Sequence, residues 1–578
     1  MSCQKDDDKL SVVIEDDDQT ETTSDPVYTE YFNQSISEAM ESNKDNHEVS
    51  GDEKWEEEGA ITIQLNETSI TTTEGSVEIN GTTATITKAG IYIIQGTLSD
   101  GQIMVNTEDE ETVKIVLNNV SVTNTSNAPF GVMSAEKVVV FLPENTQNTF
   151  SDATTYVYEG DEDEPNATFF SKADLSIYGT GNITVNANYN DGISSKDGLI
   201  ISSGNFTINS VDDGIRGKDY LIIKGGTFNV QSDGDAFKSD NDDDEDRGYI
   251  LIENGTFNVA TTAGDGFSAE TDLLIADGAF DLVTGGGSDS FDEEVSSKAL
   301  KAGINNVIEG GTFTINSADD ALHCDGNLVI GGGTFSIASG DDGIHADEEL
   351  TINGGEITIT ESYEGLESNV LTINDGTIHL VSSDDGINGA GGNDGSGIRP
   401  GQGNSSSSSK SSLYIQGGYI VVEASGDGVD VNGSIEMTAG ILLVNGPAQG
   451  ANGPLDYDNS FKISGGLLIA AGTSNMAQAP SSTSTQNSIL LYLDSQSANT
   501  LFVVQNSEGE ALVTYSPSVR YESIVYSSSK LVKSSSYKVY IGGSATGSET
   551  DGLYEDATYN SGTLVSSFTL SSTITQIN

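Results

Sequence analysis

A short pattern of apolar and polar positions repeats along the middle of the chain and is clearest in residues 317–359. In each copy an acidic turn is followed by a strand-like segment of alternating apolar residues, a glycine turn and a second such segment. Asp320 and Asp342 are 22 residues apart, and so are Gly333 and Gly355. Internal repeats with a period of about 20–50 residues are typical of solenoids, so the pattern predicts a repeat architecture.

From residue 191 onward the repeat can be aligned on a column of glycines, each followed two residues later by a large apolar residue. The glycines are Gly204, Gly226, Gly255, Gly278, Gly311, Gly333, Gly355, Gly376, Gly418, Gly440 and Gly466. The alternation of apolar and polar residues places one face of each strand inside. Such short strands are not stable alone, so each coil must hydrogen-bond to the next. The sequence therefore predicts an all-β fold, a parallel β-helix.

The pattern divides the chain into four parts. Residues 1–58 are rich in acids and poor in apolar residues, which predicts a disordered acidic tether. Residues 59–190 contain irregular β-like segments and are expected to form leading coils or a cap. Residues 191–479 are expected to form the regular part of the parallel β-helix. Residues 480–578 lack the glycine column and are expected to be a small C-terminal β cap over the open end.

The amino terminus carries one candidate modification site. Cys3 stands in Met-Ser-Cys-Gln-Lys-Asp-Asp-Asp, which resembles the mature start of a bacterial lipoprotein with the acidic export signal of Bacteroidetes surface lipoproteins. The sequence has no apolar signal segment before this cysteine, so we interpret Met1 as a start codon that replaces the signal segment. The resemblance implies lipidation at Cys3 and a cell-surface, outer-membrane location. An ordinary disordered terminus is the alternative.

Composition excludes several classes of protein. The net charge of −67 and the pI near 4.1 argue against nucleic acid as a partner, because phosphates require Lys and Arg. Two cysteines exclude a disulfide framework. No apolar run reaches the roughly 18 residues of a membrane span, so a membrane contact is expected only through a lipid at Cys3. We expect a monomer.

Aspartates recur at the turn that opens each repeat and are often paired. Stacked carboxylates about 4.8 Å apart repel one another by about 1 kcal/mol per pair even in water, which favours a bound cation. Calcium, which takes oxygen ligands, is the expected cofactor. The alternative is that Asp and Gly are simply good turn formers. The predicted metal ligands are Asp212, Asp213, Asp235, Asp265, Asp319, Asp320, Asp341, Asp342, Asp384 and Asp385.

Three positions after each column acid stands an outward residue, and in several coils it is basic or imidazole. These residues would form a strip beside the acids that suits an acidic sugar polymer. The predicted substrate-binding residues are Arg216, Lys238, Lys301, His323 and His345. A transition-metal pair at His323 and His345 is left open. Cys324 falls in the following column of small residues and is expected to be a buried, inert thiol.

Lys298 replaces the aspartate of one coil. A lysine whose pKa is lowered near metal-bound carboxylates could abstract the proton α to a uronate carboxyl group. A lone lysine among acids, however, is more often a structural ion pair. We therefore predict no catalytic residues, with Lys298 or Lys301 as the base if the protein is a polysaccharide lyase.

Three insertions interrupt the repeat, at Asp240–Arg247, around Gly285–Ser297 and at Gly389–Ser412. All three are predicted to lie between the strand after the glycine column and the following leucine-rich strand, next to the acidic turn. Insertions gathered on one side of a solenoid often mark its binding face.

Several segments together resemble a known family. They are the Asp-Asp-Gly-Ile and Gly-Gly-Thr-Phe repeats, the segment Gly90–Ile103, and the closing Tyr-Lys-Val-Tyr-Ile-Gly-Gly. The chain resembles, over about residues 60–575, the bacterial carbohydrate-binding domain-containing proteins. The resemblance implies a right-handed parallel β-helix, similar in fold to family 9 pectate lyases. It also implies calcium-dependent binding of cellulose or acidic, pectin-like polysaccharide, without established catalysis, and it fixes no individual ligand residue.

Three functions stay open on this basis. The first is a surface protein that binds polysaccharide through calcium without cleaving it. The second is a calcium-dependent lyase with a lysine base, and the third is a structural adhesin or matrix protein. The scarcity of aromatic residues in the outward columns favours charged or soluble glycans over crystalline cellulose.

Overall fold

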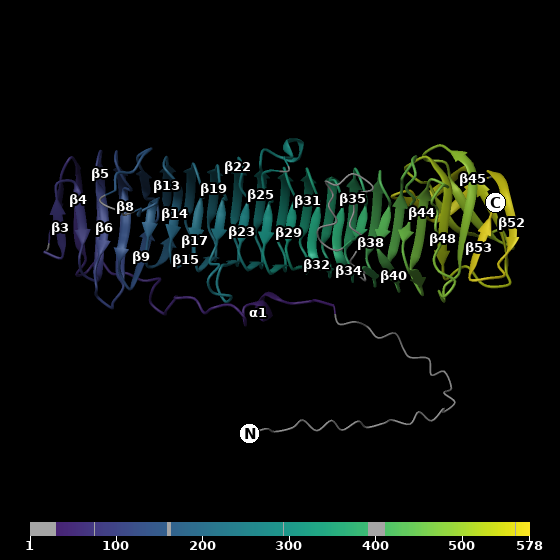
Figure 1. Ribbon diagram of the computed structural model, residues 1–578, viewed down its shortest axis with the longest axis horizontal. Coiled ribbons are helices and arrows are strands. Elements are labelled where there is room, and N and C mark those ends of the chain that lie inside the picture. Colours follow the sequence, from purple (N-terminus) through teal and green to yellow (C-terminus); the bar gives the residue numbers. More distant parts are fainter. Residues whose placement is uncertain (1–30, 74, 159–162, 293, 391–410, 561) are drawn as a thin grey trace, which may run out of the picture. The chain divides into compact units, whose positions relative to one another are not determined.

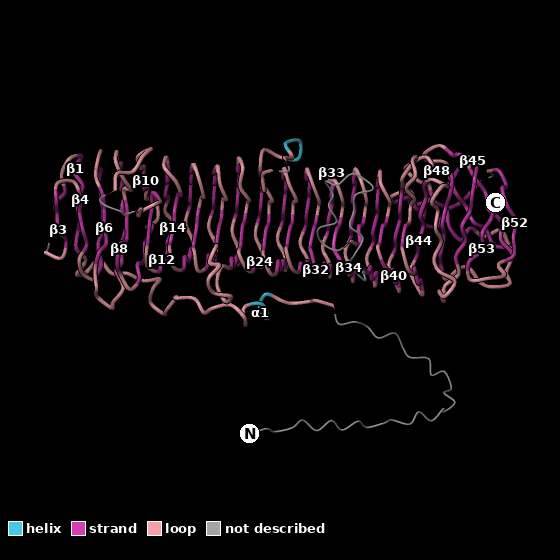
Figure 2. Tube along the Cα trace, in the orientation of Figure 1, coloured by secondary structure: helices cyan, strands magenta, loops and turns pink. Residues whose placement is uncertain are grey.

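The computed structural model describes residues 31–73, 75–158, 163–292, 294–390, 411–560 and 562–578. All but Tyr31 belong to one compact unit, Phe32–Asn578, to which the following description applies. In this unit short strands succeed one another along a single axis, as Figures 1 and 2 show. No helix among the described residues is long and apolar enough to cross a membrane. The predicted Cys3 lipidation site lies outside the described residues.

Most of the unit is a parallel β-helix with three strands per coil, and each strand pairs in parallel with its equivalent in the next coil. Three sheets therefore run along the axis, and we name them by what they carry. The phenylalanine sheet contains β10 (Gln147–Ser151), β13 (Asn182–Ala187), β16 (Asn205–Ser210), β19 (Thr227–Ser232), β22 (Thr256–Thr261), β25 (Ala279–Thr284), β28 (Thr312–Ser317), β31 (Thr334–Ser339), β33 (Glu356–Glu361), β35 (Thr377–Ser382), β38 (Tyr419–Ala424), β41 (Ile441–Asn445) and β44 (Leu467–Gly472). The site sheet contains β8 (Phe130–Ser134), β11 (Ala167–Ser171), β14 (Asp191–Ser195), β17 (Ile215–Gly217), β20 (Phe237–Ser239), β23 (Phe267–Ala269), β26 (Leu300–Ala302), β29 (Leu322–Cys324), the first halves of β32 (Ile344–Ile352) and β34 (Leu366–Ile373), β36 (Ile387–Gly389), β39 (Val429–Val431) and β42 (Asp456–Tyr457). The strap sheet contains β9 (Lys137–Leu142), β12 (Asp174–Gly179), β15 (Gly198–Ile201), β18 (Tyr220–Ile223), β21 (Tyr249–Ile252), β24 (Asp272–Ile275), β27 (Asn305–Ile308), β30 (Asn327–Ile330), the second halves of β32 and β34, β37 (Ser411–Ile415), β40 (Gly433–Met437) and β43 (Ser460–Ile463).

The interior confirms the prediction of a parallel β-helix. Six phenylalanines of the phenylalanine sheet, from Phe206 to Phe335, stack in successive coils with ring centroids 4.5–5.0 Å apart and nearly parallel planes. All eleven column glycines have positive φ, between +80° and +156°. This is backbone that other L-residues rarely adopt, so the corner before each phenylalanine strand depends on glycine.

Both ends of the helix are closed by additional strands. The leading coils are built from β1 (Ile61–Glu67), β2 (Ile70–Thr72), β3 (Val77–Asn80), β4 (Thr83–Ile86), β5 (Gly90–Leu98), β6 (Gln102–Asn106) and β7 (Val113–Thr123). At the other end β48 (Tyr521–Ser528) pairs antiparallel with both β44 and β45 (Ser488–Gln496), and β53 (Ile574–Ile577) joins β45. A six-stranded sheet completes the cap, with β46 (Phe502–Asn506), β47 (Ala511–Tyr515), β49 (Ser536–Ile541), β50 (Ser544–Thr550), β51 (Leu553–Asn560) and β52 (Thr563–Thr569). The predicted antiparallel C-terminal cap is confirmed.

The prediction of a disordered tether over residues 1–58 is corrected for residues 32–58, which we call the strap. The strap lies along the outer face of the strap sheet and includes the helix α1 (Ile36–Ala39) (Figure 1). Ala39 is buried against outward side chains of β24, β27 and β30, and Trp55 packs near Phe141. The acidic composition concealed these widely spaced apolar anchors, which bind a surface that the coils have already formed.

As predicted, each of the three insertions lies between a strand of the phenylalanine sheet and the next strand of the strap sheet. They lie on both edges of the site sheet, however, so the prediction that all are next to the acidic turn is wrong. Residues 285–297 connect β25 to β26 at the edge with the acidic turns, and they include the short 3-10 helix η1 (Ser288–Ser290). Residues 240–247 connect β20 to β21 at the opposite edge. The third insertion begins after β36 at that same edge, and most of it lies outside the described residues.

Candidate functional site

The site sheet aligns the outward column that the sequence predicted. In the register of neighbouring parallel strands, Arg216 lies opposite Lys238, Lys238 opposite Ser268 and Ser268 opposite Lys301. The column continues through His323, His345, Glu367, Asn388 and Asp430. The structure therefore brings all five predicted substrate-binding residues into one row along the sheet.

The acidic column runs beside this row and is held by backbone hydrogen bonds. One carboxylate oxygen of most column acids accepts a backbone N–H from the next coil. The distances include 3.0 Å from Asp235 N to Asp213 Oδ1, 2.8 Å from Asp265 N to Asp235 Oδ1 and 3.0 Å from Asp342 N to Asp320 Oδ1. A carboxylate that accepts a backbone N–H is stabilised without any metal. The repetition of aspartate therefore has a structural cause, and it does not by itself require calcium, as the sequence argument assumed.

The second oxygen of many column acids faces a cation of the outward row. Lys238 Nζ lies 3.2 Å from Asp213 Oδ2 and 2.9 Å from Asp235 Oδ2. Lys301 Nζ lies 3.6 Å from Asp265 Oδ2. Arg216 instead forms a two-point ion pair with Asp240 of the first insertion. The predicted substrate-binding cations are thus engaged by the protein's own acids, which leaves little free positive charge for an acidic glycan.

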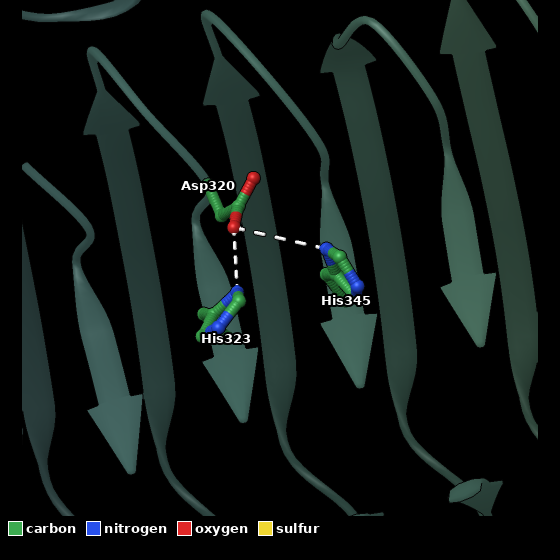
Figure 3. A group of neighbouring side chains, drawn as sticks. All are labelled: Asp320, His323 and His345. Carbon is green, nitrogen blue, oxygen red and sulfur yellow. Dashed lines mark hydrogen bonds and ion pairs between the residues drawn. The ribbon is translucent and has the colours of Figure 1, made fainter. Parts of the chain in front are cut away.

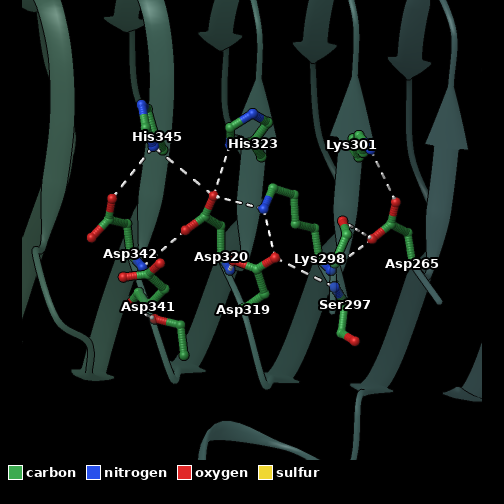
Figure 4. Close-up of polar contacts among 12 residues, drawn as sticks. Asp265, Ser297, Lys298, Lys301, Asp319, Asp320, His323, Asp341, Asp342 and His345 are labelled. Carbon is green, nitrogen blue, oxygen red and sulfur yellow. Dashed lines mark hydrogen bonds and ion pairs between the residues drawn. The ribbon is translucent and has the colours of Figure 1, made fainter. Parts of the chain in front are cut away.

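Lys298 is the most enclosed of these cations (Figure 4). Its Nζ lies 2.6 Å from Asp319 Oδ2 and 3.3 Å from Asp320 Oδ2. Burial alone would lower the pKa of Lys298, but the two aspartates outweigh burial and raise it above that of a free lysine. A general base at neutral pH needs the opposite shift. The lyase alternative would need a lowered pKa at Lys298, whereas the geometry is that of the structural ion pair that the sequence favoured.

Four further predicted metal ligands, Asp341, Asp384, Asp212 and Asp213, have other acids or a tyrosine as neighbours. Burial, followed by the charges of Asp342, Asp320 and Asp319, raises the pKa of Asp341 to about 8. Asp384 accepts a hydrogen bond from the hydroxyl of Tyr363, 2.7 Å away. At the other end of the row, Asp212 and Asp213 lie beside Asp191, with one oxygen of each within 4.8 Å of the others.

Beyond Glu367 the character of the row changes, because acids replace the cations. Asp385, Asp427 and Asp430 each present a carboxylate oxygen within 4.8 Å of the other two. Among the described residues none of the three forms an ion pair with Lys, Arg or His. Burial and the neighbouring carboxylates raise the pKa of Asp385 to about 8 and that of Asp430 to about 7. We call these three residues the acid-only cluster; an oxygen-only set of this kind fits calcium.

His323 and His345 lie in adjacent coils with their rings edge to face and the ring centroids 5.0 Å apart, and both face Asp320 (Figure 3). Nδ1 of His323 lies 2.7 Å from Asp320 Oδ2, and its Nε2 lies 2.9 Å from Asp325 Oδ1. Burial would lower the pKa of His323, but Asp320 and Asp325 raise it. Both ring nitrogens of His323 are thus hydrogen-bonded to carboxylates, which argues against a metal ion shared by the two histidines.

A groove crosses the site sheet between the first two insertions. It has a volume of about 860 Å³ and is lined by residues of both insertions and of the outward row, including Lys238, Asp240, Glu245, Glu294 and Lys301. A second hollow of about 610 Å³ lies under the second insertion, with Phe291, Lys298, Asp341 and Tyr363 in its lining. In the linings of both hollows acidic residues outnumber basic ones.

The sequence did not assign a metal-binding role to Asp427, Asp430 or Glu367. All three occupy positions in the two columns that were recognised from the repeat. The available signal was the loss of Lys and His from the outward row after His345. Cys324 is buried as expected, and burial raises the pKa of its thiol to about 12, so it is not a nucleophile at neutral pH.

Comparison with known proteins gives three matches. The profile of a family described as carbohydrate-binding domain-containing protein matches residues 80–343 and 341–386, more than half of the chain. A protein of Acetivibrio thermocellus with that same description is 44% identical over 126 residues. The match spans 22% of this chain and 44% of that relative, so the chain covers less than half of the relative's length.

The third match is a solved structure, described as the polysaccharide lyase-like protein from C. thermocellum in a gadolinium derivative. It shares 27% identity and covers 51% of this chain and 96% of its own, with a TM-score of 0.35. That score is too low to equate the two folds, and neither the lyase-like description nor the gadolinium is transferred to this chain.

Proposed function

Because this chain belongs to the carbohydrate-binding domain-containing protein family, we propose that it binds an acidic polysaccharide at the site sheet through calcium, without cleaving it. We place the protein at the cell surface, with Cys3 as the lipid-bearing residue. The observation that carries the proposal is the acid-only cluster of Asp385, Asp427 and Asp430, which continues the outward row and its acidic turns.

Electrostatics explains why a dication is required. The chain has a net charge of −67, and the lysines, the arginine and the histidines of the row are paired with its own acids. A uronate polymer would be repelled from such a surface. Calcium accepts about six to eight oxygen ligands, so three carboxylates would leave positions for carboxylates and hydroxyls of the glycan. The cation would therefore join protein and ligand.

The state of Lys298 supports binding without cleavage. Its ammonium group is held by Asp319 and Asp320, and its raised pKa leaves almost no free base at neutral pH. A lyase would need a neutral group next to the sugar ring. We therefore assign Lys298 to the support of the site sheet.

Glycan binding with and without EGTA tests the proposal. Immobilised polygalacturonate should retain the protein in calcium and release it in EGTA. The double variant Asp427→Asn/Asp430→Asn should lose at least about tenfold in affinity, since it removes two of three anionic ligands. Asp281→Asn removes an exposed acid of the phenylalanine sheet and is the matched control, expected to bind as the original protein does.

Three outcomes would contradict the proposal. If EGTA does not change the retention of the protein, calcium has no role in glycan binding. Absence of affinity for every glycan on an array would favour the adhesin. Unsaturated products, followed by absorbance and lost in Lys298→Ala, would establish the lyase.

A further inference from the structure

One group of side chains in the row contains an imidazole among carboxylates and is separate from the acid-only cluster. His345 Nδ1 lies 3.4 Å from Asp342 Oδ2, 3.7 Å from Glu367 Oε2 and 3.9 Å from Asp320 Oδ2. His345 and Glu367 are register partners on β32 and β34, and Asp342 stands in the turn just before β32. One nitrogen and three oxygens thus converge from consecutive coils (Figure 4 shows the aspartates and His345).

Glu367 is the member that calls for a missing partner. Its side chain is only 3% exposed, and its Oε1 accepts no hydrogen bond. Its Oε2 faces Nδ1 of His345 at 3.7 Å, which is too long for a good hydrogen bond. A buried carboxylate is costly unless it is paired, hydrogen-bonded or bound to a metal. Burial and the adjacent Asp342 carboxylate raise the pKa of Glu367 to about 11, so the two acids share a proton here, and a dication between them would take the place of that proton.

His345 is oriented as a metal ligand would be. Its Nε2 lies 3.2 Å from Asp347 Oδ1, on the side away from the cluster. Asp347 favours a proton on Nε2 although the two groups form no hydrogen bond, and a metal at Nδ1 would displace the second proton that the surrounding carboxylates hold by raising the pKa of His345 to about 12. His323 differs, because both of its ring nitrogens are engaged by Asp320 and Asp325.

We propose that Asp342, His345 and Glu367 bind one divalent transition ion of the Zn²⁺ class, with water or Asp320 in the fourth position. Zinc ligand distances of about 2.0–2.2 Å place tetrahedral ligand atoms about 3.3–3.6 Å apart, close to the separations of 3.4 and 3.7 Å around Nδ1. Calcium prefers oxygen ligands only, so the imidazole selects against it. The site goes beyond the proposed glycan binding and does not depend on it.

Calorimetric titration of Zn²⁺ into the chelator-treated full chain tests the site, with excess calcium present to fill the acid-only cluster. We expect one zinc ion per chain. His345→Gln and Glu367→Gln should each weaken binding by at least about tenfold, because each removes a ligand. His323→Gln is the matched control, a neighbouring histidine with no free lone pair, and should change the affinity by less than about twofold. Asp427→Asn should also leave zinc binding unchanged.

The Co²⁺-substituted protein gives a second readout. A ligand-field spectrum of a tetrahedral site should appear in the original protein and in His323→Gln, and should be absent from His345→Gln. If His345→Gln does not fold, the same measurements are made on Glu367→Gln, which preserves the size and shape of the side chain and should also lack the spectrum. The inference is overturned if the chain binds no zinc in calcium, or if His345→Gln and His323→Gln bind it equally, because the ion would then be held elsewhere.

Discussion

Each aspartate of the acidic column uses its two carboxylate oxygens differently. Asp213, for example, accepts the N–H of Asp235 with Oδ1 and faces Lys238 with Oδ2. The first contact sets the spacing between coils, and the second sets the charge of the surface. Because only the second varies from coil to coil, the row can change from paired to unpaired acids without any change in the backbone.

The first prediction concerns Lys298→Met. It leaves Asp319 and Asp320 without their enclosed cation, and removal of one partner of a buried pair costs about 3–5 kcal/mol in the free energy of unfolding. Lys301→Met is the control, since Lys301 is 34% exposed with a single contact of 3.6 Å and should cost less than about 1 kcal/mol. Urea unfolding at neutral pH measures both. Equal losses would contradict the structural role of Lys298.

The second prediction concerns Asp191 and pH. Burial, then the charge of Asp213, raises the pKa of Asp191 to about 7, and its Oδ2 accepts no hydrogen bond. The folded state therefore holds a proton that the unfolded state loses near pH 4, so stability falls as the pH rises from about 4 to 7. Asp191→Asn removes this dependence. It should stabilise the protein by up to about 4 kcal/mol at pH 8 and have little effect at pH 4.

The measurement is the free energy of unfolding of both proteins across that pH range. A parallel pH dependence of the two would contradict the raised pKa. Asp281→Asn again serves as the control, because Asp281 is exposed on the phenylalanine sheet and should show no such difference.

At the scale of elements, the third prediction concerns the glycine corners. Gly226 has a φ of +126°, and a Cβ there would lie 3.0 Å from the carbonyl oxygen of Gly204 and 3.2 Å from the ring of Phe228. Gly226→Ala should therefore destabilise the protein by about 1–3 kcal/mol. The adjacent Gly225 has no such φ, and its Cβ would meet a single atom at 3.5 Å. Gly225→Ala should be nearly neutral; similar losses in both variants would contradict the account of the column.

The repeating elements could be predicted from the sequence because a coil has a fixed register. A glycine, a phenylalanine two residues later and an acidic turn return at the same offsets, and the structure places them in the predicted columns. What each column acid contacts could not be predicted. Lys298, for instance, contacts Asp319, whereas Lys301 contacts Asp265. Which aspartate each lysine reaches depends on the direction of its side chain, which the repeat does not specify.

The strap was missed for a different reason. Phe32, Ile36 and Trp55 are widely spaced within an acidic segment, so the average composition indicated disorder. Each docks on apolar or polar groups of coils that are far away in sequence, as in the hydrogen bond from Phe32 N to Glu349. A segment with few anchors can be ordered by a surface that is already folded, and no local pattern reveals this.

At the scale of the whole unit, the fourth prediction concerns removal of residues 1–58. The strap covers an apolar stripe formed by Ile222, Leu251, Leu274, Val307 and Val329. Exposure of a contiguous apolar stripe promotes association. The truncated chain should therefore have a lower melting temperature and should elute as larger species on size exclusion. A truncated chain that stays monomeric with an unchanged melting temperature would contradict a stabilising role for the strap.

The strap also changes how the coils depend on one another. In most solenoids each repeat contacts only its neighbours, so that unfolding can begin at one end and stop partway. Here one segment contacts the strap sheet from Lys137, which pairs with Asp52 at 2.7 Å, to Glu349, which accepts the N–H of Phe32. Coils that are separated by more than 200 residues are thereby fastened to one continuous piece of chain. Partial unfolding between those points must release the strap as well, which should merge local openings into one cooperative event and keep the row of binding residues rigid along its length.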